Sequence, residues 1–149
     1  MTHLGPQFEA ALVFATQAHA QQMRKGAGVP YVAHLLQVAG IALEHGADES
    51  VAIAALLHDA AEDQGGEAML SEIEARFGPE VAGMVRECSD TLEPTKPPWR
   101  VRKKQYLAHL EEATAGARLV SAADKLHNAR SIVDDLRREG AHAFSKFKG

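Results

Sequence analysis

The chain has 149 residues, 46% of them hydrophobic and 24% charged, and a formal net charge of −4 at pH 7. This length favours one domain over residues 1–149 with a sizeable core, and the charge leaves no basic surplus for general nucleic-acid binding. The N-terminus lacks the basic and apolar regions of a secretory signal, and the longest apolar run, 51–57, is too short to span a membrane. We therefore expect a cytoplasmic protein. The sole cysteine, Cys88, cannot form an internal disulfide, which favours a buried structural thiol.

Helical patterns dominate the first half of the chain. Apolar residues recur every three or four positions from Phe8 to Ala18, which predicts a helix over 6–22. The Gly-rich stretch "RKGAGVP" (24–30) predicts a loop, and a second helix is expected over about 32–44. Asp48 or Ser50 is suited to cap a third helix, which carries "AALLHDAAED" (54–63) and ends at "QGG" (64–66).

The second half continues in the same way. Ser71 and Glu74 have the spacing of a capping box, and Pro79 is suited to open the next helix, which is expected to reach about Asp90. Three prolines make "DTLEPTKPPW" (90–99) an irregular connection, and helices are predicted over about 100–113 and 117–138. The tail "GAHAFSKFKG" (140–149) starts a short further helix. Because no segment alternates as a strand does, the predicted class is all-α.

His58 and Asp59 stand at the end of an apolar run, where unpaired ionisable groups are costly to bury. Neighbouring helical residues point about 100° apart, so both side chains can reach one ion beside the helix end. Imidazole and carboxylate are good ligands for Mn, Fe or Zn. The alternative is a surface helix end in water, which the dipeptide alone favours.

Glu62 and Asp63 follow four residues later. Residues four apart share a helical face, so His58 is expected to pair with Glu62 and Asp59 with Asp63. Carboxylates this close raise one another's pKa values and are costly without a cation. Either the two acids lie in a solvated exit turn before Gly65, or they position or deprotonate an attacking water. The spacing leaves both interpretations open.

Two further segments carry candidate residues. His34 lies among apolar residues near the start of the second helix, where a lone histidine is usually a hydrogen-bonded core residue. The late helix carries Asp124, His127 and Asn128 within "SAADKLHNAR" (121–130), and periodicity places Asp124 and Asn128 on a solvent face. The small, apolar stretch 119–123 also allows cover on two sides. The core stripe predicted for this helix is Leu119, Ala122, Ala123, Leu126 and Val133.

A cluster of positive charges lies beside Trp99. The pattern favours a solvated helix face with Trp99 packed as an anchor, and the alternative is a wall that meets a polyphosphate. The charges belong to Lys96, Arg100, Arg102, Lys103 and Lys104.

The pattern His34, His58-Asp59 and Asp124 resembles the metal-binding signature of the HD phosphohydrolase superfamily. The strings "RKGAGVPYVAH", "ALLHDAAED" and "ADKLHNAR" resemble one branch, the small alarmone hydrolases related to the hydrolase domain of Rel/Spo-type (p)ppGpp enzymes. The resemblance runs from about Phe8 to Arg138. It implies an all-helical HD-domain bundle and one Mn²⁺, or another divalent transition metal, held by His34, His58, Asp59 and Asp124.

The resemblance also implies roles for other residues. Glu62 and Asp63 would activate the attacking water, Arg24 and Lys25 would line the pocket, and Asn128 would lie near the nucleoside. Lys96 and Arg100 are further candidates for substrate binding, as part of the polyphosphate wall. The family often has Pro where this chain has Leu35, and relatives usually continue beyond the position of Gly149 into a helix with aromatic residues. The expected bundle is therefore short at its C-terminus.

The function implied is removal of the 3′-pyrophosphate of ppGpp, with a small-molecule nucleotide as partner and neither nucleic acid nor membrane. A homo-oligomer is compatible with the sequence. One alternative is an HD phosphatase acting on a nucleoside monophosphate or NADPH. The other is a catalytically silent nucleotide-binding module.

Overall fold

A series of helices makes up the computed structural model, which describes residues 1–26 and 28–147. The all-α prediction is confirmed, because these described residues contain no β-strand. Within them, no helix has both the length and the apolar character that a membrane span requires. The elements are α1 (Pro6–Ala18), α2 (Val32–Glu44), α3 (Glu49–Leu57), α4 (Ala60–Gln64), α5 (Gly66–Phe77), α6 (Pro79–Cys88), α7 (Trp99–Glu112), α8 (Ala115–Glu139) and the 3₁₀ helix η1 (Gly140–Lys146).

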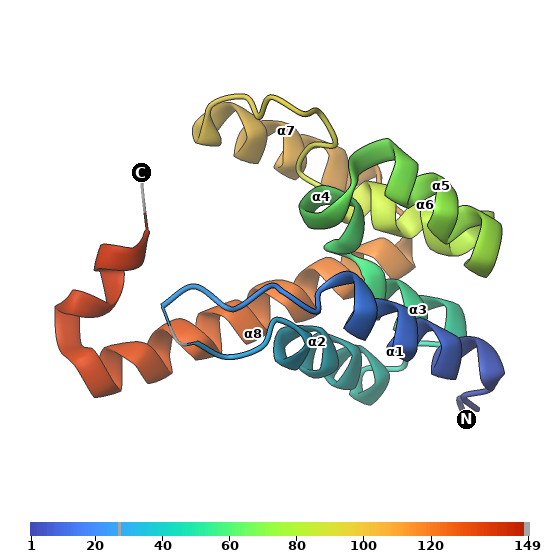
Figure 1. Cartoon of the computed structure of the whole chain (residues 1–149), viewed down its shortest axis with the longest axis horizontal. Coiled ribbons are helices and arrows are strands. Elements are labelled where there is room, and N and C mark those ends of the chain that lie inside the picture. Colours follow the sequence, from blue (N-terminus) through green and yellow to red (C-terminus); the bar gives the residue numbers. More distant parts are fainter. Residues whose placement is uncertain (27, 148–149) are drawn as a thin grey trace.

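Helix α3 forms the centre of the core. Its residues 52–57 are all buried, as expected for a helix that is apolar on every face. Helices α1, α2, α6 and α8 pack around it (Figure 1). At the start of α8, a Cβ on Gly116 would lie 2.6 Å from Met84 Sδ and 2.9 Å from Val51 Cγ2. Glycine at this position therefore allows α8 to approach α3 and α6 closely.

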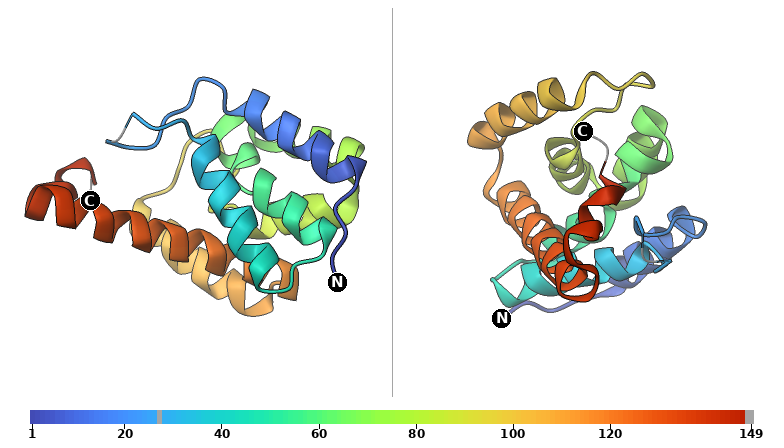
Figure 2. Two further views of the ribbon diagram at one scale, coloured as in Figure 1. Left: turned by 90° about the horizontal axis from the view of Figure 1, so that it is seen from below. Right: turned by 90° about the vertical axis from the view of Figure 1, so that its left-hand side faces the viewer.

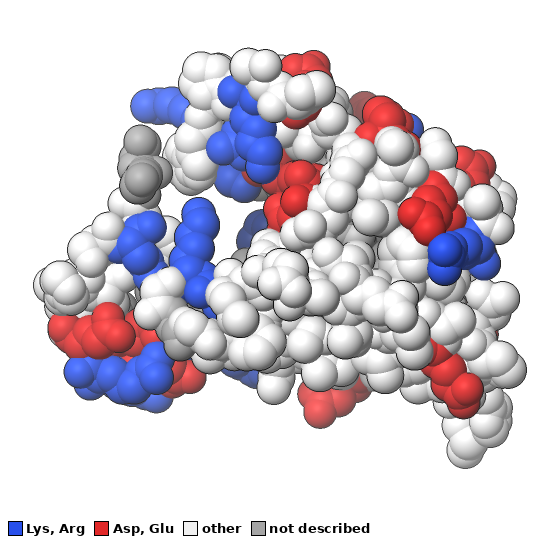
Figure 3. Space-filling model, viewed as in Figure 1, with Lys and Arg blue, Asp and Glu red and all other residues white. Residues whose placement is uncertain are grey.

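Two elements project from this core. The C-terminal half of α8 extends beyond the other helices, and η1 turns back at its end (Figures 1 and 2). Helix α7 buries only Tyr106 among its described residues, and the Tyr106 hydroxyl is hydrogen-bonded to Ser121 of α8. The surface is hollowed between these two projections, which leaves an opening (Figure 3).

The helix boundaries in the first half of the chain are partly as predicted. Helix α2 has the expected bounds, and Asp48 caps α3 by accepting a hydrogen bond from the Val51 N–H at 2.9 Å. Helix α1 ends at Ala18, four residues early, because the chain turns there towards the loop that leads to α2. The predicted third helix is two helices, α3 and α4, separated at His58 and Asp59.

In the second half, the predicted capping box is wrong. Helix α5 begins at Gly66, directly after the turn at Gly65, so Ser71 lies inside the helix. Helix α8 begins at Ala115 and is capped by the Thr114 side chain, which accepts a hydrogen bond from the Ala117 N–H. The short helix predicted in the tail is η1. Residues 148–149 of that tail and Ala27 of the predicted loop lie outside the described residues.

The core stripe predicted for α8 is also wrong in most positions. Ala123 is buried, but Ala122, Leu126 and Val133 are exposed, whereas Asp124 is buried. The N-terminal half of α8 packs against α2, α3 and α6. These tertiary contacts cover the face of the helix that the periodicity had predicted to be exposed to solvent.

Cys88 is buried, as predicted. Its Sγ donates to the Ala117 carbonyl at 3.5 Å, and burial raises the pKa of the thiol to about 11. Because the thiolate is the reactive form, we expect negligible modification by a thiol reagent at pH 8 in the folded protein and complete modification in denaturant. An Ala75→Cys variant, which places a thiol at an exposed position on α5, serves as a control that labels at once. Rapid labelling of Cys88 in the folded protein would contradict this prediction.

Candidate active site

Two histidines and two aspartates from three parts of the chain lie close together. His34 comes from α2, His58 and Asp59 from the break between α3 and α4, and Asp124 from α8. One potential ligand atom from each lies within 4.8 Å of the others. His34 Nε2 is 3.0 Å from Asp124 Oδ1, and His58 Nε2 is 3.1 Å from Asp59 Oδ2. We call these four residues the His/Asp cluster.

The break between α3 and α4 sets the direction of His58. Its Nδ1 lies 2.7 Å from the Ala55 carbonyl oxygen, which accepts only, so Nδ1 carries the proton. In the neutral imidazole the other nitrogen, Nε2, then has a free lone pair, and this nitrogen faces the carboxylates. The expected pairing of His58 with Glu62 is not seen, because the helix is interrupted between them and Glu62 contacts a different segment.

The cluster fits a divalent cation. Within the described residues, the Nε2 atoms of His34 and His58 are buried and have no hydrogen-bond partner. Buried polar atoms without partners are rare, and both atoms face carboxylate oxygens across 3.0–3.7 Å. Two neutral imidazoles and two carboxylates carry a combined charge of minus two. Nitrogen and oxygen donors of this kind suit Zn, Mn or Fe.

Neighbouring groups hold the two aspartates. The Tyr31 hydroxyl donates to Asp59 Oδ2 at 2.5 Å. Lys125 Nζ donates to Asp124 Oδ2 at 2.5 Å, and Asn128 Nδ2 donates to Asp124 Oδ1 at 3.0 Å. Hydrogen bonds of this kind fix the orientation of metal-ligating carboxylates in proteins.

His127 gives the same support to His34. The two Nδ1 atoms are 2.7 Å apart, so one nitrogen donates and the other accepts. Burial, together with the neighbouring His34 and Arg24, lowers the pKa of His127 to about 4. His127 is therefore neutral at pH 7 and can accept the Nδ1–H of His34, which leaves Nε2 of His34 free for the centre of the cluster.

Glu62 and Asp63 lie on α4, beside the cluster. Glu62 Oε2 accepts a hydrogen bond from the Asp90 N–H at 3.0 Å, and Lys96 Nζ is 3.7 Å from Glu62 Oε1. Asp63 Oδ2 accepts a hydrogen bond from Gln22 at 3.0 Å. Burial raises the pKa of both carboxyl groups, and the negative charge of Asp59 raises them further. Carboxylates with raised pKa values are better proton acceptors near neutral pH.

Arg24 connects the loop before α2 to the cluster. Its guanidinium donates to Asn128 Oδ1 at 3.1 Å and to Ser131 Oγ at 3.4 Å, and it lies 6.0 Å from the centre of the Tyr31 ring. Asn128 in turn donates to Asp124. Lys25 is exposed, and across residues 1–26 and 28–147 no hydrogen bond or ion pair joins it to the cluster.

The basic residues near α7 are divided between two environments. Arg102 and Lys103 both bind the buried side chain of Asp90, at 3.0 and 2.5 Å, whereas Arg100 is exposed. Trp99 is 58% exposed, so the expectation that it packs as an anchor is wrong. Figure 3 shows the surface hollowed between α7 and the projecting part of α8, with Lys and Arg side chains on both sides of the opening. Basic side chains therefore border this opening.

Several residues of the site escaped the sequence analysis. Tyr31 lies three residues before His34, and Lys125 directly follows Asp124. Their proximity in sequence to a candidate ligand was the signal that could have indicated them as site residues. Gln22 and Asp90 contact Asp63 and Glu62 across 41 and 28 residues, respectively. Nothing local in the sequence marks contacts over such separations.

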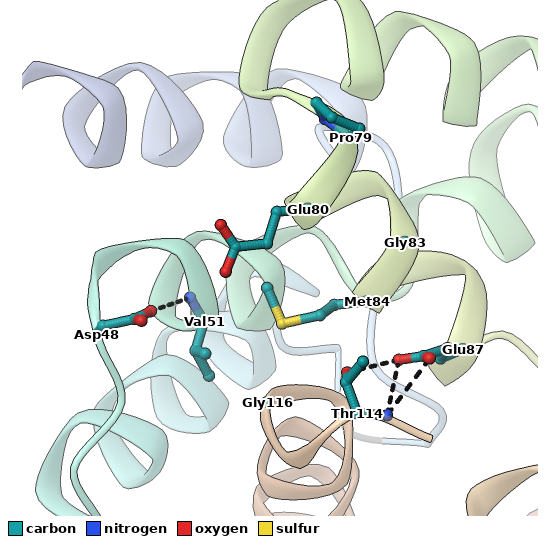
Figure 4. Close-up of a pocket in the computed structure, with 9 residues that line it drawn as sticks. All are labelled: Asp48, Val51, Pro79, Glu80, Gly83, Met84, Glu87, Thr114 and Gly116. Atoms are coloured by element: carbon teal, nitrogen blue, oxygen red, sulfur yellow. Dashed lines mark hydrogen bonds between the residues drawn. The ribbon is translucent and has the colours of Figure 1, made fainter. Parts of the chain in front are cut away.

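A pocket of about 390 Å³ lies elsewhere and shares no residue with the His/Asp cluster. It lies between α6 and the N-terminal ends of α3 and α8, where Asp48 accepts a hydrogen bond from the Val51 N–H and Glu87 accepts from Thr114 (Figure 4). Asp48 and Glu87 therefore serve the ends of helices. The residues that line it are Asp48, Val51, Pro79, Glu80, Gly83, Met84, Glu87, Thr114 and Gly116.

Comparison with known proteins identifies the family of this chain. A family model described as the HD domain matches residues 11–148, so the chain belongs to the HD-domain family. Among its relatives is the guanosine-3′,5′-bis(diphosphate) 3′-pyrophosphohydrolase of Drosophila melanogaster, which is 36% identical over 88% of this chain and 72% of its own length. The Homo sapiens protein of the same name is 41% identical over 80% of this chain and 65% of its own length.

A solved structure described as a metazoan ortholog of SpoT that hydrolyzes ppGpp has the same fold. It superimposes with a TM-score of 0.79 at 34% identity, covering 90% of this chain and 74% of the other. The resemblance to the small alarmone hydrolases is thereby confirmed. The chain spans about two thirds to three quarters of the length of these relatives.

Proposed function

We propose that the chain is a Mn²⁺-dependent phosphohydrolase that removes the 3′-pyrophosphate of ppGpp. The observation that carries the proposal is the His/Asp cluster, with Glu62 and Asp63 beside it. The names of the relatives, which are 3′-pyrophosphohydrolases of guanosine-3′,5′-bis(diphosphate), support the choice of substrate.

In this proposal, His34, His58, Asp59 and Asp124 hold the cation. A bound divalent cation supplies a Lewis acid for a phosphoryl oxygen and acidifies water. Glu62 and Asp63 accept the proton of the attacking water, for which their raised pKa values are suited. Tyr31, Lys125 and His127 keep the cation-binding side chains in their observed orientations.

Charged side chains at the opening would hold the phosphates. Arg24 has a planar guanidinium of which one nitrogen is bonded to Asn128 and Ser131, so the remaining donors are available to phosphate oxygens. Asn128 is placed between Arg24 and Asp124, which suits contact with the nucleoside. One divalent cation cannot neutralise a pyrophosphate, and Lys96, Arg100 and Lys25 would supply further positive charge.

The test is a Mn²⁺-supplemented assay with a panel of nucleotides. We expect ppGpp to release pyrophosphate and GDP, and nucleoside monophosphates and NADPH to release little phosphate. Faster release of phosphate from a nucleoside monophosphate or from NADPH than of pyrophosphate from ppGpp would show that ppGpp is not the preferred substrate. Binding of ppGpp without release of either product would indicate a nucleotide-binding module instead.

Replacement of Arg24 tests the basic border. Charge-assisted hydrogen bonds contribute roughly 1.5–3 kcal/mol each, so we expect Arg24→Ala to lower kcat/KM by about one to two decades. Metal content should not change, because Arg24 is outside the His/Asp cluster. The matched control is Arg137→Ala, whose side chain is 77% exposed and pairs with Asp134 at 3.7 Å. Equal kcat/KM for Arg24→Ala and the wild type would contradict the phosphate contact.

A further inference from the structure

Gln22, in the turn that follows α1, contacts one of the two acids on α4. Its Nε2 donates to Asp63 Oδ2 at 3.0 Å, although the two residues are 41 positions apart. The backbone of Gln22 is held on both sides, because its N–H donates to the His19 carbonyl at 3.0 Å and its carbonyl accepts from the Tyr31 N–H at 2.9 Å. The Gln22 side chain therefore extends from a backbone position that is held in place by hydrogen bonds.

The orientation of the Gln22 amide follows from its other contacts. Its Oε1 accepts a hydrogen bond from Gln64 Nε2 at 2.7 Å and lies 2.7 Å from His19 Nδ1. An amide oxygen only accepts, so His19 must donate through Nδ1–H. With two donors at the oxygen, the NH₂ group is the part of the amide that faces Asp63.

The His19 side chain is itself held in place. Its side chain is 3% exposed and stacks on the Tyr31 ring, with centroids 5.1 Å apart and planes inclined by 28°. Tyr31 in turn donates to Asp59 of the His/Asp cluster. The contacts of Gln22, His19 and Tyr31 thus connect Asp63 to Asp59, which would bind the cation.

We propose that Gln22 is a positioning residue for Asp63, holding one carboxylate oxygen so that the other is directed at the attacking water. The inference rests on the proposed function, in which Asp63 accepts a proton. Gln22 suits this task because its amide donates without titrating and therefore does not compete for that proton.

The first test uses Gln22→Met, which keeps the length of the side chain and removes the donor. We expect kcat on ppGpp to fall about ten- to hundredfold, as for the loss of one charge-assisted hydrogen bond, while KM and metal content stay unchanged. In an Asp63→Asn background the same change should have no further effect, because Gln22 acts through Asp63. The control is Gln21→Met, at the exposed neighbouring position.

A second measurement does not need turnover. Titration of the Asp63 carboxyl carbon by NMR, in protein loaded with diamagnetic Zn²⁺, gives its pKa directly. We expect a higher pKa in Gln22→Met than in the wild type, because the donor favours the charged carboxylate. An unchanged pKa, or an equal loss of kcat in the Asp63→Asn background, would overturn the role of Gln22. If the wild type cleaves no nucleotide but the pKa rises as expected, the positioning contact stands and the proposed function fails.

Discussion

Asp59→Ala is expected to abolish binding of the divalent cation and to reduce hydrolysis to background. The change removes one of the two anionic groups of the His/Asp cluster, which leaves two imidazoles and Asp124 to hold the cation. It also removes the acceptor of the Tyr31 hydroxyl, which is bonded to Asp59 Oδ2. The remaining three groups carry half of the original negative charge, so the cation loses both a ligand and much of its electrostatic attraction.

Metal content and thermal unfolding measure this loss separately. Elemental analysis of the wild type should give about one Mn²⁺ per chain, and that of Asp59→Ala close to none. A cation at one hundred times its Kd stabilises a folded protein by about 2.7 kcal/mol, so added Mn²⁺ should raise the Tm of the wild type and leave that of the variant unchanged. Asp134→Ala is the control, because Asp134 is an exposed acid on α8 outside the cluster. Unchanged metal content in Asp59→Ala would show that the ligand assignment is wrong.

Replacement of both acids on α4 is expected to separate catalysis from metal binding. Glu62→Gln with Asp63→Asn keeps the size of each side chain and removes its capacity to accept a proton. We expect turnover to fall by about two to four decades, the usual contribution of a positioned acid or base, with metal content unchanged. The control pair is Glu111→Gln with Glu112→Gln, two adjacent exposed acids at the end of α7.

The same acids predict a pH dependence. A proton acceptor must be ionised, and burial raises the pKa of both Glu62 and Asp63. Turnover of the wild type should therefore fall as the pH drops through these raised values, at a higher pH than ordinary carboxyl groups would give. The double variant should lack this acid limb. Wild-type turnover in the double variant, with the metal bound, would exclude the two residues as the base.

The sequence was sufficient to predict the helical class, which depends on local pattern, and the candidate ligands, which were taken from a resemblance to a family. Helix α2 and the cap of α3 at Asp48 follow from periodicity and from the residue types that favour helix ends. His34, His58, Asp59 and Asp124 were selected by a family signature, and the structure brings them together. Their role as metal ligands remains a proposal.

Other features depend on contacts between distant segments. The apolar periodicity predicted the wrong buried face for α8. Asp124 is covered by α2 and α3, and its partners there are polar side chains. The separation of α3 from α4 was missed because His58 and Asp59 both keep right-handed helical backbone angles. An interruption without glycine or proline leaves no signal in the sequence.

Helix α8 fixes the distance between residues of the site as well as their contacts. Asp124, Asn128 and Ser131 occupy successive turns of one face, and Arg24 is bonded to the last two. With a rise of about 1.5 Å per residue, the backbone positions of Asp124 and Ser131 are about 10 Å apart. In the proposed function, this rigid spacer sets how far the phosphate under attack lies from the phosphate that Arg24 grips. Selection among nucleotides by molecular length would then be a property of helix geometry, and a residue inserted between positions 124 and 131 would destroy it by turning Ser131 about 100° away.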